Sequence, residues 1–287
     1  MKILRTNSSA LAATSGASRW FQSSIDQEGV MFLSLVSGSS GNATLITDEQ
    51  TTILIDCGLS GKKLEAAFAS IGRSPKELDA ILVTHEHIDH TAGVGVVSRR
   101  FDVPVYATAG TYRGMSVGKL ADKNIHTIAP EQSFEIGTIG VCPFSISHDA
   151  NDPVGFSFFV NHKKVSLATD TGTMTDSIKQ HILGSEAVIL ESNHDVDMLL
   201  YGSYPYSLKQ RILSERGHLS NDDCAKTAVE LLQSGTRHIL LGHLSNENNT
   251  PEIAFRTAVN ALRKAGAAID SDVRLGVARR YEATAVL

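Results

Sequence analysis

The sequence predicts one α/β (α+β) domain in which two β-sheets pack face to face and helices cover their outer faces. Short apolar runs rich in branched side chains fill the first half of the chain, whereas strand and helix patterns alternate in the second half. Acids and histidines gather where apolar runs end. Two packed sheets accommodate this order, because each sheet then has one face buried against the other and one face covered by helices.

The first half is predicted to be mainly β-structure. Apolar runs predict strands at 32–36, 43–47, 51–55, 81–83 and 104–107, antiparallel strands within 125–159, and a hairpin at 134–139. Helices are predicted there at 62–71 and 91–101.

The second half is predicted to be mixed. Strands are expected at 164–168, 187–190, 239–241, near Val273 and over 280–286, with helices at 174–183, 206–213, 222–233 and 251–265. The last helix has Pro251 at its start and Gly266 just past its end, as helices commonly do. No linker rich in Pro, Gly or Ser follows residue 42, so we expect residues 31–287 to form one domain.

Residues 1–30 differ from the rest in composition. They are rich in Ser and Ala and carry Lys2, Arg5 and Arg19 before the first acid, Asp26. We interpret them as an N-terminal extension that is poorly ordered and has no part in the chemistry. An organellar transit peptide is the alternative interpretation.

The overall composition indicates a soluble cytoplasmic protein, 42% hydrophobic and 20% charged. The 26 Lys+Arg and 31 Asp+Glu give a net charge of -5, so bulk charge carries no sign of nucleic-acid binding. Cys57, Cys142 and Cys224 are few and far apart, which favours a reducing compartment and argues against disulfides, including one to a partner. No apolar run approaches the roughly 20 residues of a membrane helix.

The densest group of metal-binding side chains is the segment 85–90, His-Glu-His-Ile-Asp-His, which directly follows the apolar run 80–84. Side chains alternate faces in an extended chain, so His85 and His87 point the same way. Asp89 and His90 come after the turn and can reach a second point close by. Imidazole and carboxylate are natural ligands of zinc and similar divalent metals. The segment therefore predicts a metal site.

Other acids and histidines also follow apolar strands and are candidates to join this cluster: Asp56, His148, Asp170 and His243. Each alone is equally well explained as a capped strand end. Together with the first cluster they have the right number for two metals, since each metal needs about four protein groups and one group is shared.

These motifs resemble those of the metallo-β-lactamase fold superfamily over the chain from Met31 to its end, and Asp56 matches a motif that usually supports the metal loop. Within the superfamily, the sequence is most similar to the bacterial YycJ/WalJ group. The matching segments are 37–43, 83–87, 147–150, 191–195, 211–214, 217–221 and 243–245. The resemblance implies a four-layer αββα sandwich and a dinuclear hydrolase, specifically a phosphodiesterase that acts as a 5′-to-3′ DNA exonuclease and serves DNA repair.

The resemblance also implies a ligand set. One metal would be held by His85, His87 and His148, and the other by Asp89, His90 and His243, with Asp170 bridging the two. A hydroxide shared by the metals, which Asp89 also orients, would be the nucleophile. We expect zinc, with manganese as the alternative, because the same nitrogen and oxygen ligands accept both. Two divalent cations against two carboxylates leave a positive site that suits an anionic phosphodiester.

Three further residues are candidates for catalysis. His218 precedes a predicted helix and Glu191 ends an apolar strand, at places where nucleases of the superfamily have a histidine and an acid. We assign proton donation to the leaving group to His218, with Glu191 orienting it; a purely structural Glu–His hydrogen bond is the alternative. His194, just beyond Glu191, is expected to contact phosphate, or else simply to pack.

Candidate substrate-binding residues lie in two other places. The loop at 38–42, with Ser39 and Asn42, can offer backbone N–H groups to phosphate, although a plain strand-to-strand turn explains it as well. Lys209 and Arg211 lie on a predicted helix beside Tyr204-Pro205-Tyr206 and would form a basic, aromatic lip for single-stranded DNA. An ordinary amphipathic helix face is the alternative interpretation.

Three hypotheses about function follow. The first is the metal-dependent nuclease acting on single-stranded DNA or DNA ends. The second is a hydrolase of small thioesters, lactones or cyclic phosphodiesters on the same metals, which would not need Glu191, His194 and His218. The third is a metal-stabilised scaffold without enzymatic activity, which ranks lowest because all seven ligands are present.

Overall fold

The structure is a computed structural model and describes residues 29–287. The predicted N-terminal extension, 1–30, therefore lies outside the described residues except for its last two positions. Among the residues that are described, no helix has both the length and the apolar character needed to cross a membrane.

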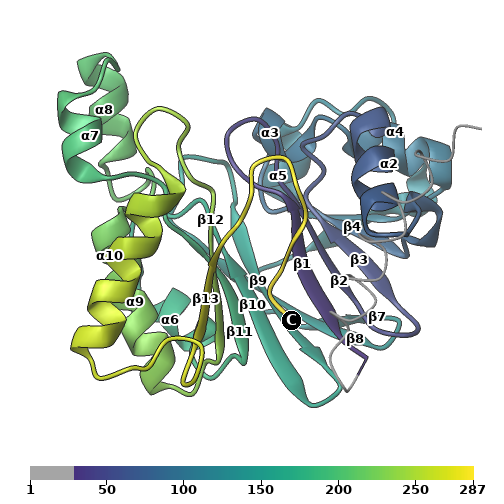
Figure 1. The fold of residues 1–287 in the computed structure, drawn as a ribbon. Coiled ribbons are helices and arrows are strands. Elements are labelled where there is room, and N and C mark those ends of the chain that lie inside the picture. Colours follow the sequence, from purple (N-terminus) through teal and green to yellow (C-terminus); the bar gives the residue numbers. More distant parts are fainter. Residues whose placement is uncertain (1–28) are drawn as a thin grey trace, which may run out of the picture.

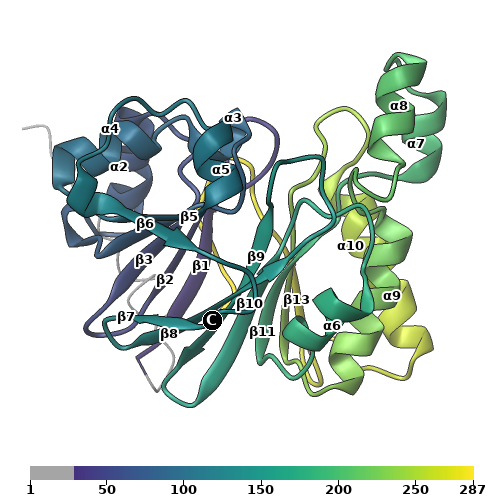
Figure 2. The same ribbon diagram turned by 180° about the vertical axis from the view of Figure 1, so that it is seen from behind.

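Two seven-stranded mixed sheets form the centre of the molecule (Figures 1 and 2). The first sheet has the order β14-β1-β2-β3-β4-β5-β6. Its strands are β1 (Met31–Val36), β2 (Ala43–Thr47), β3 (Thr52–Ile55), β4 (Ala80–Leu82), β5 (Val105–Thr108), β6 (Ile125–Ile128) and β14 (Thr284–Ala285). The pairs from β14 to β3 are antiparallel, and those from β3 to β6 are parallel.

The second sheet repeats this plan in the order β13-β12-β11-β10-β9-β8-β7. Its strands are β7 (Phe134–Ile136), β8 (Ile139–Ser145), β9 (Val154–Val160), β10 (Lys163–Ala168), β11 (Ala187–Glu191), β12 (His238–Gly242) and β13 (Arg274–Val277). The pairs from β7 to β10 are antiparallel, and those from β10 to β13 are parallel. In each sheet the parallel strands end at the same edge, which brings their following loops together.

Helices cover the outer face of each sheet (Figure 1). The first sheet is covered by α2 (Gly61–Ser70) and α4 (Val94–Phe101), with the short α3 (Ile88–Thr91) and α5 (Ala109–Gly114) beside them. The second is covered by α6 (Asp176–Ile182), α9 (Asn221–Gln233) and α10 (Pro251–Lys264), and α7 (Val196–Tyr201) and α8 (Tyr206–Ile212) project beyond its edge. Two 3-10 turns, Pro75–Glu77 and Asp122–Asn124, complete the elements of the described chain. The predicted fold class is thus confirmed.

The apolar core is divided by the two sheets into three layers. Phe32 and Phe158 belong to the layer between the sheets, where their ring centroids lie 6.4 Å apart. Leu33 faces the opposite way from Phe32 and packs in the layer beneath α2 and α4. Leu241 packs beneath the helices of the second sheet. Strands buried on both faces explain why the sequence shows continuous apolar runs and not alternation.

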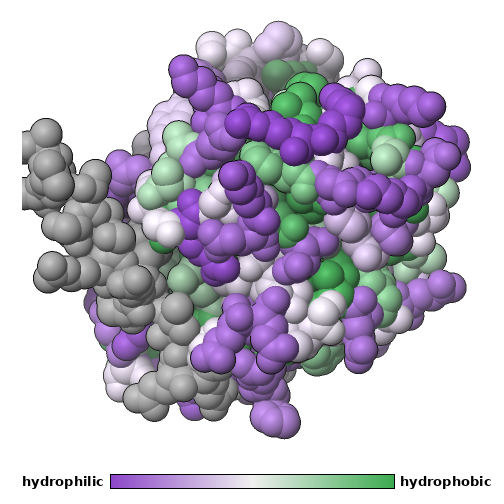
Figure 3. Space-filling view, turned by 90° about the vertical axis from the view of Figure 1, so that its right-hand side faces the viewer, coloured by the Kyte–Doolittle hydropathy of each residue, from purple (hydrophilic) through white to green (hydrophobic). Residues whose placement is uncertain are grey.

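The helices that cover the first sheet present a largely hydrophilic surface to solvent, as Figure 3 shows. Lys62 and Lys63 are exposed on α2, while Leu64 and Phe68 of the same helix are buried. This helix therefore has one apolar face toward the sheet and one polar face toward water.

Several elements differ from prediction. The expected helix at 91–101 is divided into α3 and α4 at Gly93, whose backbone packs so closely that an added Cβ would lie 2.0 Å from the Leu59 carbonyl oxygen. Strand β6 pairs parallel with β5 and not antiparallel. The closing strand is shorter than expected, Thr284–Ala285, because the chain from 278 to 283 crosses the sheet edge as a loop.

Candidate metal centre

The residues Asp56, Asp170 and His243 each follow a strand, and all three have left-handed backbone conformations. Their φ angles are 59°, 58° and 56°. Only a few per cent of non-glycine residues adopt positive φ, and such residues are concentrated at functional sites. A residue in this conformation turns the chain where the strand ends. Three strands, β3, β10 and β12, therefore deliver polar groups to one place.

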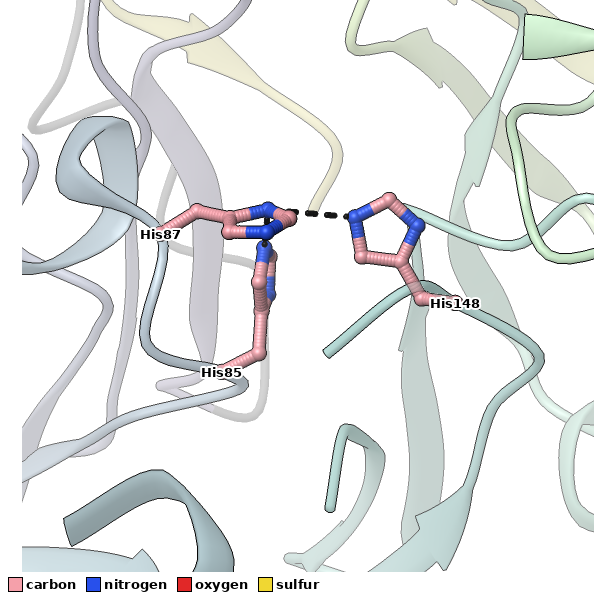
Figure 4. A group of neighbouring side chains, drawn as sticks. All are labelled: His85, His87 and His148. Atoms are coloured by element: carbon pink, nitrogen blue, oxygen red, sulfur yellow. Dashed lines mark hydrogen bonds between the residues drawn. The ribbon is translucent and has the colours of Figure 1, made fainter. Parts of the chain in front are cut away.

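The first group of predicted ligands consists of His85, His87 and His148, which come from both sheets (Figure 4). His85 Nε2 lies 3.0 Å from His87 Nδ1, and His148 Nε2 lies 3.3 Å from the same atom. Ligand nitrogens about 2.0–2.1 Å from a tetrahedral zinc ion would lie about 3.3–3.4 Å apart. The distances from His87 to the other two nitrogens are therefore close to those expected between the ligands of one zinc ion, and all three nitrogens lie within 4.8 Å of one another.

The second group contains His90, His243, Asp89 and Asp170. His90 Nε2 lies 3.6 Å from one oxygen of each aspartate. His243 Nε2 lies 3.3 Å from Asp170 Oδ1 and 3.8 Å from Asp89 Oδ2. Asp170 Oδ2 and His243 Nε2 are buried and have no hydrogen-bond partner in the described chain. Buried polar atoms rarely lack partners, so these two fit a bound cation.

Asp170 connects the two groups. Its carboxylate also lies within 4.8 Å of the ligand atoms of His85 and His90. All seven residues that the sequence predicts as ligands are thus brought together at one sheet edge. Their individual assignment to one metal or the other stays a prediction.

The other nitrogen of several predicted ligands is held by a fixed partner. Asp56 Oδ2 lies 2.8 Å from His90 Nδ1, and the Gly217 carbonyl oxygen lies 3.1 Å from His148 Nδ1. Thr84 donates its hydroxyl to Asp56 and contacts His85 Nδ1 at 3.0 Å. Such contacts fix the ring orientation and tautomer of metal-binding histidines. Asp56 thus supports the cluster, as expected.

The charges around the cluster also favour a cation. Burial opposes ionisation of Asp170, but the charges of His243 and His90 hold its pKa well below the usual range. Burial likewise opposes protonation of His243, yet the charge of Asp170, the nearby Asp89 carboxylate and the contact with Glu191 raise its pKa to about 10. Positive charge is therefore strongly favoured in this part of the site. Burial lowers the pKa of His85 well below its ordinary value, which keeps that ring in its neutral, ligating form.

Glu191 lies behind the second group and contacts two histidines with one oxygen. Its Oε1 lies 2.8 Å from His218 Nδ1 and 2.9 Å from His243 Nδ1. Its Oε2 accepts hydrogen bonds from the backbone N–H groups of Thr171 and Leu219. Although burial opposes ionisation, His218 and these contacts lower the pKa of Glu191 to about 2. Glu191 is therefore an ionised, fully buried anchor for both rings.

His218 Nδ1 lies 4.0 Å from Asp170 Oδ1, so its ring borders the cluster while its side chain stays partly exposed. His194 is buried, and neither of its ring nitrogens has a partner in the described chain. Burial lowers the pKa of His194 to about 4, so its ring is neutral at pH 7.

The four predicted substrate-binding residues differ in exposure and in hydrogen-bond partners. Ser39 is exposed, whereas Asn42 is buried and its Nδ2 lies 3.0 Å from His90 Nε2. Lys209 donates to the carbonyl oxygens of Leu200 and Gly202, at the end of α7. Arg211 pairs with Asp149, beside His148. The two cations of the expected lip thus already have protein partners.

Sequence reasoning missed several residues that hold the site. Arg216 donates through Nε and Nη2 to the His148 carbonyl oxygen, at 3.1 and 3.0 Å. Asn249 Nδ2 donates to the carbonyl oxygens of Ser192 and Asn193, and Asn193 Nδ2 donates to that of His243. The only signal in the sequence was a polar run before a helix, which predicts a cap and not a buried amide network.

Gly58 packs between the loops that carry Asp89 and Asn42. A Cβ added there would lie 1.7 Å from the Asp89 carbonyl oxygen and 2.7 Å from Asn42 N. We expect Gly58→Ala to lower the free energy of unfolding by about 1–3 kcal/mol, the usual cost of overpacking, and to weaken metal binding. Denaturant unfolding and metal analysis would measure both. Gly140→Ala is the control, because its added Cβ meets Phe159 at an ordinary 3.4 Å; equal behaviour of the two variants would contradict the packing argument.

The fold and the cluster together define a class of protein. Two packed sheets with outer helices hold buried histidines and aspartates at one edge. The distances between their ligand atoms, and the buried atoms that lack a hydrogen-bond partner in the described chain, fit divalent metals. This is the architecture of a metal-dependent hydrolase.

Comparisons with known proteins identify the family. Residues 51–244 match the Beta-lactamase superfamily domain. The chain is 40% identical over 251 residues to exodeoxyribonuclease WalJ of Streptococcus pneumoniae, covering 86% of this chain and 93% of that protein. It is 41% identical over 242 residues to exodeoxyribonuclease YycJ of Bacillus anthracis, covering 83% and 91%. The chain therefore belongs to the beta-lactamase superfamily and, within it, to the family of WalJ and YycJ, as the resemblance indicated.

A solved structure supports the fold. The Zn²⁺-bound PqqB of Methylobacterium extorquens matches with a TM-score of 0.65 at 16% identity, covering 88% of this chain and 99% of that one. At this identity the likeness concerns the fold alone.

Proposed function

We propose that this protein is a 5′-to-3′ DNA exonuclease that uses two divalent metal ions and that its residues 31–287 form the hydrolase domain. The observation that carries the proposal is the Glu191–His218 pair at the border of the metal cluster. A thioester releases a thiolate and needs no such proton donor, whereas the sugar oxygen of a phosphodiester is a poor leaving group and does. The two exodeoxyribonucleases that are about 40% identical support the same substrate class.

The metals would be held by the two ligand groups described above, with His85, His87 and His148 on one side and Asp89, His90, Asp170 and His243 on the other. Bound there, divalent ions would supply an activated water molecule and stabilise negative charge on the phosphate. Five imidazoles favour zinc, and the carboxylates leave manganese as the alternative.

The chain's own residues would then complete the reaction. In hydrolysis, water adds to the phosphorus atom and one P–O bond breaks, so the departing sugar oxygen must gain a proton. We assign this proton to His218 Nε2. The ionised Glu191 accepts a hydrogen bond from Nδ1 of the same ring and thereby stabilises its positive charge before transfer.

His194 has a different proposed role. Because its ring is buried and neutral, it cannot act as a cation toward phosphate at pH 7. Neither ring nitrogen has a partner among the described residues, so the ring is able to donate one hydrogen bond to substrate.

A substrate panel tests the proposal. We expect the purified protein, supplied with Zn²⁺ or Mn²⁺, to shorten 5′-phosphorylated single-stranded or nicked DNA from its 5′ end. Oligonucleotides labelled separately at each end, resolved on denaturing gels, would show the direction of shortening. Matched RNA and bis-p-nitrophenyl phosphate complete the panel. Cleavage of bis-p-nitrophenyl phosphate without cleavage of any DNA would contradict the proposal in favour of a small substrate.

A further inference from the structure

The loop between β13 and β14 brings an arginine to the edge of the metal centre. This loop is the yellow segment that crosses the upper edge of the molecule between the two sheets in Figure 1. Arg280 lies on it, is half-buried, and donates through Nη2 to the Leu244 carbonyl oxygen at 2.9 Å. Leu244 directly follows the predicted ligand His243. Within the described residues, Arg280 has no acidic partner, unlike its neighbour Arg279, which pairs with Glu282.

The guanidinium of Arg280 lies directly against Gly38. A Cβ added to this glycine would lie 2.7 Å from Arg280 Nη1, and the φ angle of +126° already favours glycine there. The arginine and the glycine turn therefore fit together closely. A larger residue at position 38 would displace the guanidinium.

The turn that receives Arg280 is itself fixed to the metal centre at both ends. Ser37 Oγ accepts a hydrogen bond from His243 N at 2.8 Å. Asn42 Oδ1 accepts one from Gly38 N at 2.9 Å, while Nδ2 of the same side chain contacts His90. The position of the turn is therefore coupled to the predicted ligands of the second group.

The tip of the turn carries unused donors. Ser39 and Ser40 are exposed, and within the described chain their backbone N–H groups make no hydrogen bond. Consecutive free N–H groups in a turn form a concavity that binds anions. Arg280 adds a permanent positive charge beside them, and a guanidinium binds phosphate oxygens through two N–H groups at once.

We propose that Arg280 and the turn Ser39–Ser40 form a phosphate-binding subsite that holds a phosphate group of the substrate beside the metal centre. This inference rests on the proposed function and deepens it, since it names the residues that would position a DNA strand. The group bound is either the 5′-terminal phosphate monoester or an internal phosphodiester of the strand. Arg280 is a positioning residue, because it acts on a phosphate next to the reacting one.

Arg280→Gln tests the subsite, with Arg279→Gln as the matched control. Loss of a charged contact to phosphate should raise KM for DNA roughly tenfold or more, with a smaller change in kcat. Arg280→Lys, which keeps the charge, should recover part of this loss. Hydrolysis of bis-p-nitrophenyl phosphate and the melting temperature should change little, and Arg279→Gln should match the wild type on all substrates.

Two DNA substrates distinguish the source of the phosphate. A loss confined to 5′-phosphorylated DNA identifies the terminal monoester, whereas an equal loss on 5′-phosphorylated and 5′-hydroxyl DNA identifies an internal diester. An unchanged KM on both, or a parallel loss of DNA cleavage, bis-p-nitrophenyl phosphate cleavage and melting temperature, would overturn the subsite. Binding of a fluorescent 5′-phosphorylated oligonucleotide is measured beside cleavage. A wild type that binds but does not cleave DNA would then contradict the proposed function, while the Arg280 comparison would still test the subsite.

Discussion

The purified protein is expected to contain about two divalent metal ions per chain, and Asp170→Ala to lose both metal and hydrolysis. Asp170 connects the two ligand groups, because its Oδ1 and Oδ2 lie near His243 and His90 of the second group and its carboxylate lies within 4.8 Å of the ligand atom of His85 in the first. Its removal would leave His90 and His243 without the charge that favours a cation between them. We expect metal content to fall to one ion or fewer and turnover to fall by at least about 10²–10³-fold.

Elemental analysis of the dialysed protein, together with turnover on DNA and on bis-p-nitrophenyl phosphate, would measure this effect. Asp176→Ala is the matched control, because it removes an exposed aspartate from the first turn of α6, only six residues away. Full activity in Asp170→Ala, or in protein shown to be free of metal, would disprove the metal centre as the site of hydrolysis.

His218→Ala is expected to cause the second-largest loss of turnover, but without the loss of metal expected for Asp170→Ala. The ring borders the cluster but does not belong to the predicted ligand set, since Glu191 holds its Nδ1 and its nearest contact to Asp170 is 4.0 Å. Loss of a positioned proton donor lowers turnover by about 10²–10⁴-fold. Metal content should stay unchanged, and the loss should be smaller on bis-p-nitrophenyl phosphate, whose leaving group needs no proton.

Stopped-time assays on both substrates with parallel metal analysis would separate these effects. His126→Ala is a suitable control, because His126 is a half-exposed histidine on β6 that stacks on Tyr106. Loss of metal from His218→Ala would show that His218 acts as a ligand or a structural residue. An equal loss on both substrates would argue against proton donation to the leaving group.

The strands and the histidine motif at 85–90 could be predicted because each is local in the sequence. Strand β2 has the predicted bounds, 43–47, since a short apolar run between turn residues allows few alternatives. The histidine motif lies within six residues, so its geometry follows from one strand end. Helix α7 was missed because it has only six residues, although Asp195 at its N-cap was a usable signal.

Contacts between distant segments could not be predicted in this way. The contact of Glu191 with His218 was expected from the resemblance, but nothing in the sequence indicates that the same carboxylate oxygen also contacts His243, 52 positions away. Lys209 carries the positive charge expected of a substrate-binding residue, yet its ammonium group donates hydrogen bonds to two carbonyl oxygens at the end of α7. Side-chain partners of this kind depend on how the loops at the sheet edge pack, and that packing is decided by tertiary structure.

The left-handed backbone at Asp56, Asp170 and His243 has a consequence for how this site can evolve. Apart from glycine, the residues that best tolerate positive φ are Asn, Asp and His. Two of these three are also predicted metal ligands, so conformation and the proposed chemistry select nearly the same amino acids at these positions. Most single substitutions at these positions would be disfavoured for two reasons: the polar side chain that serves the metal centre is lost, and the new residue is strained by the positive φ angle. A lineage that abandoned the chemistry could keep the fold most easily by drifting to Asn or Gly, and these positions would still mark where the metals had been.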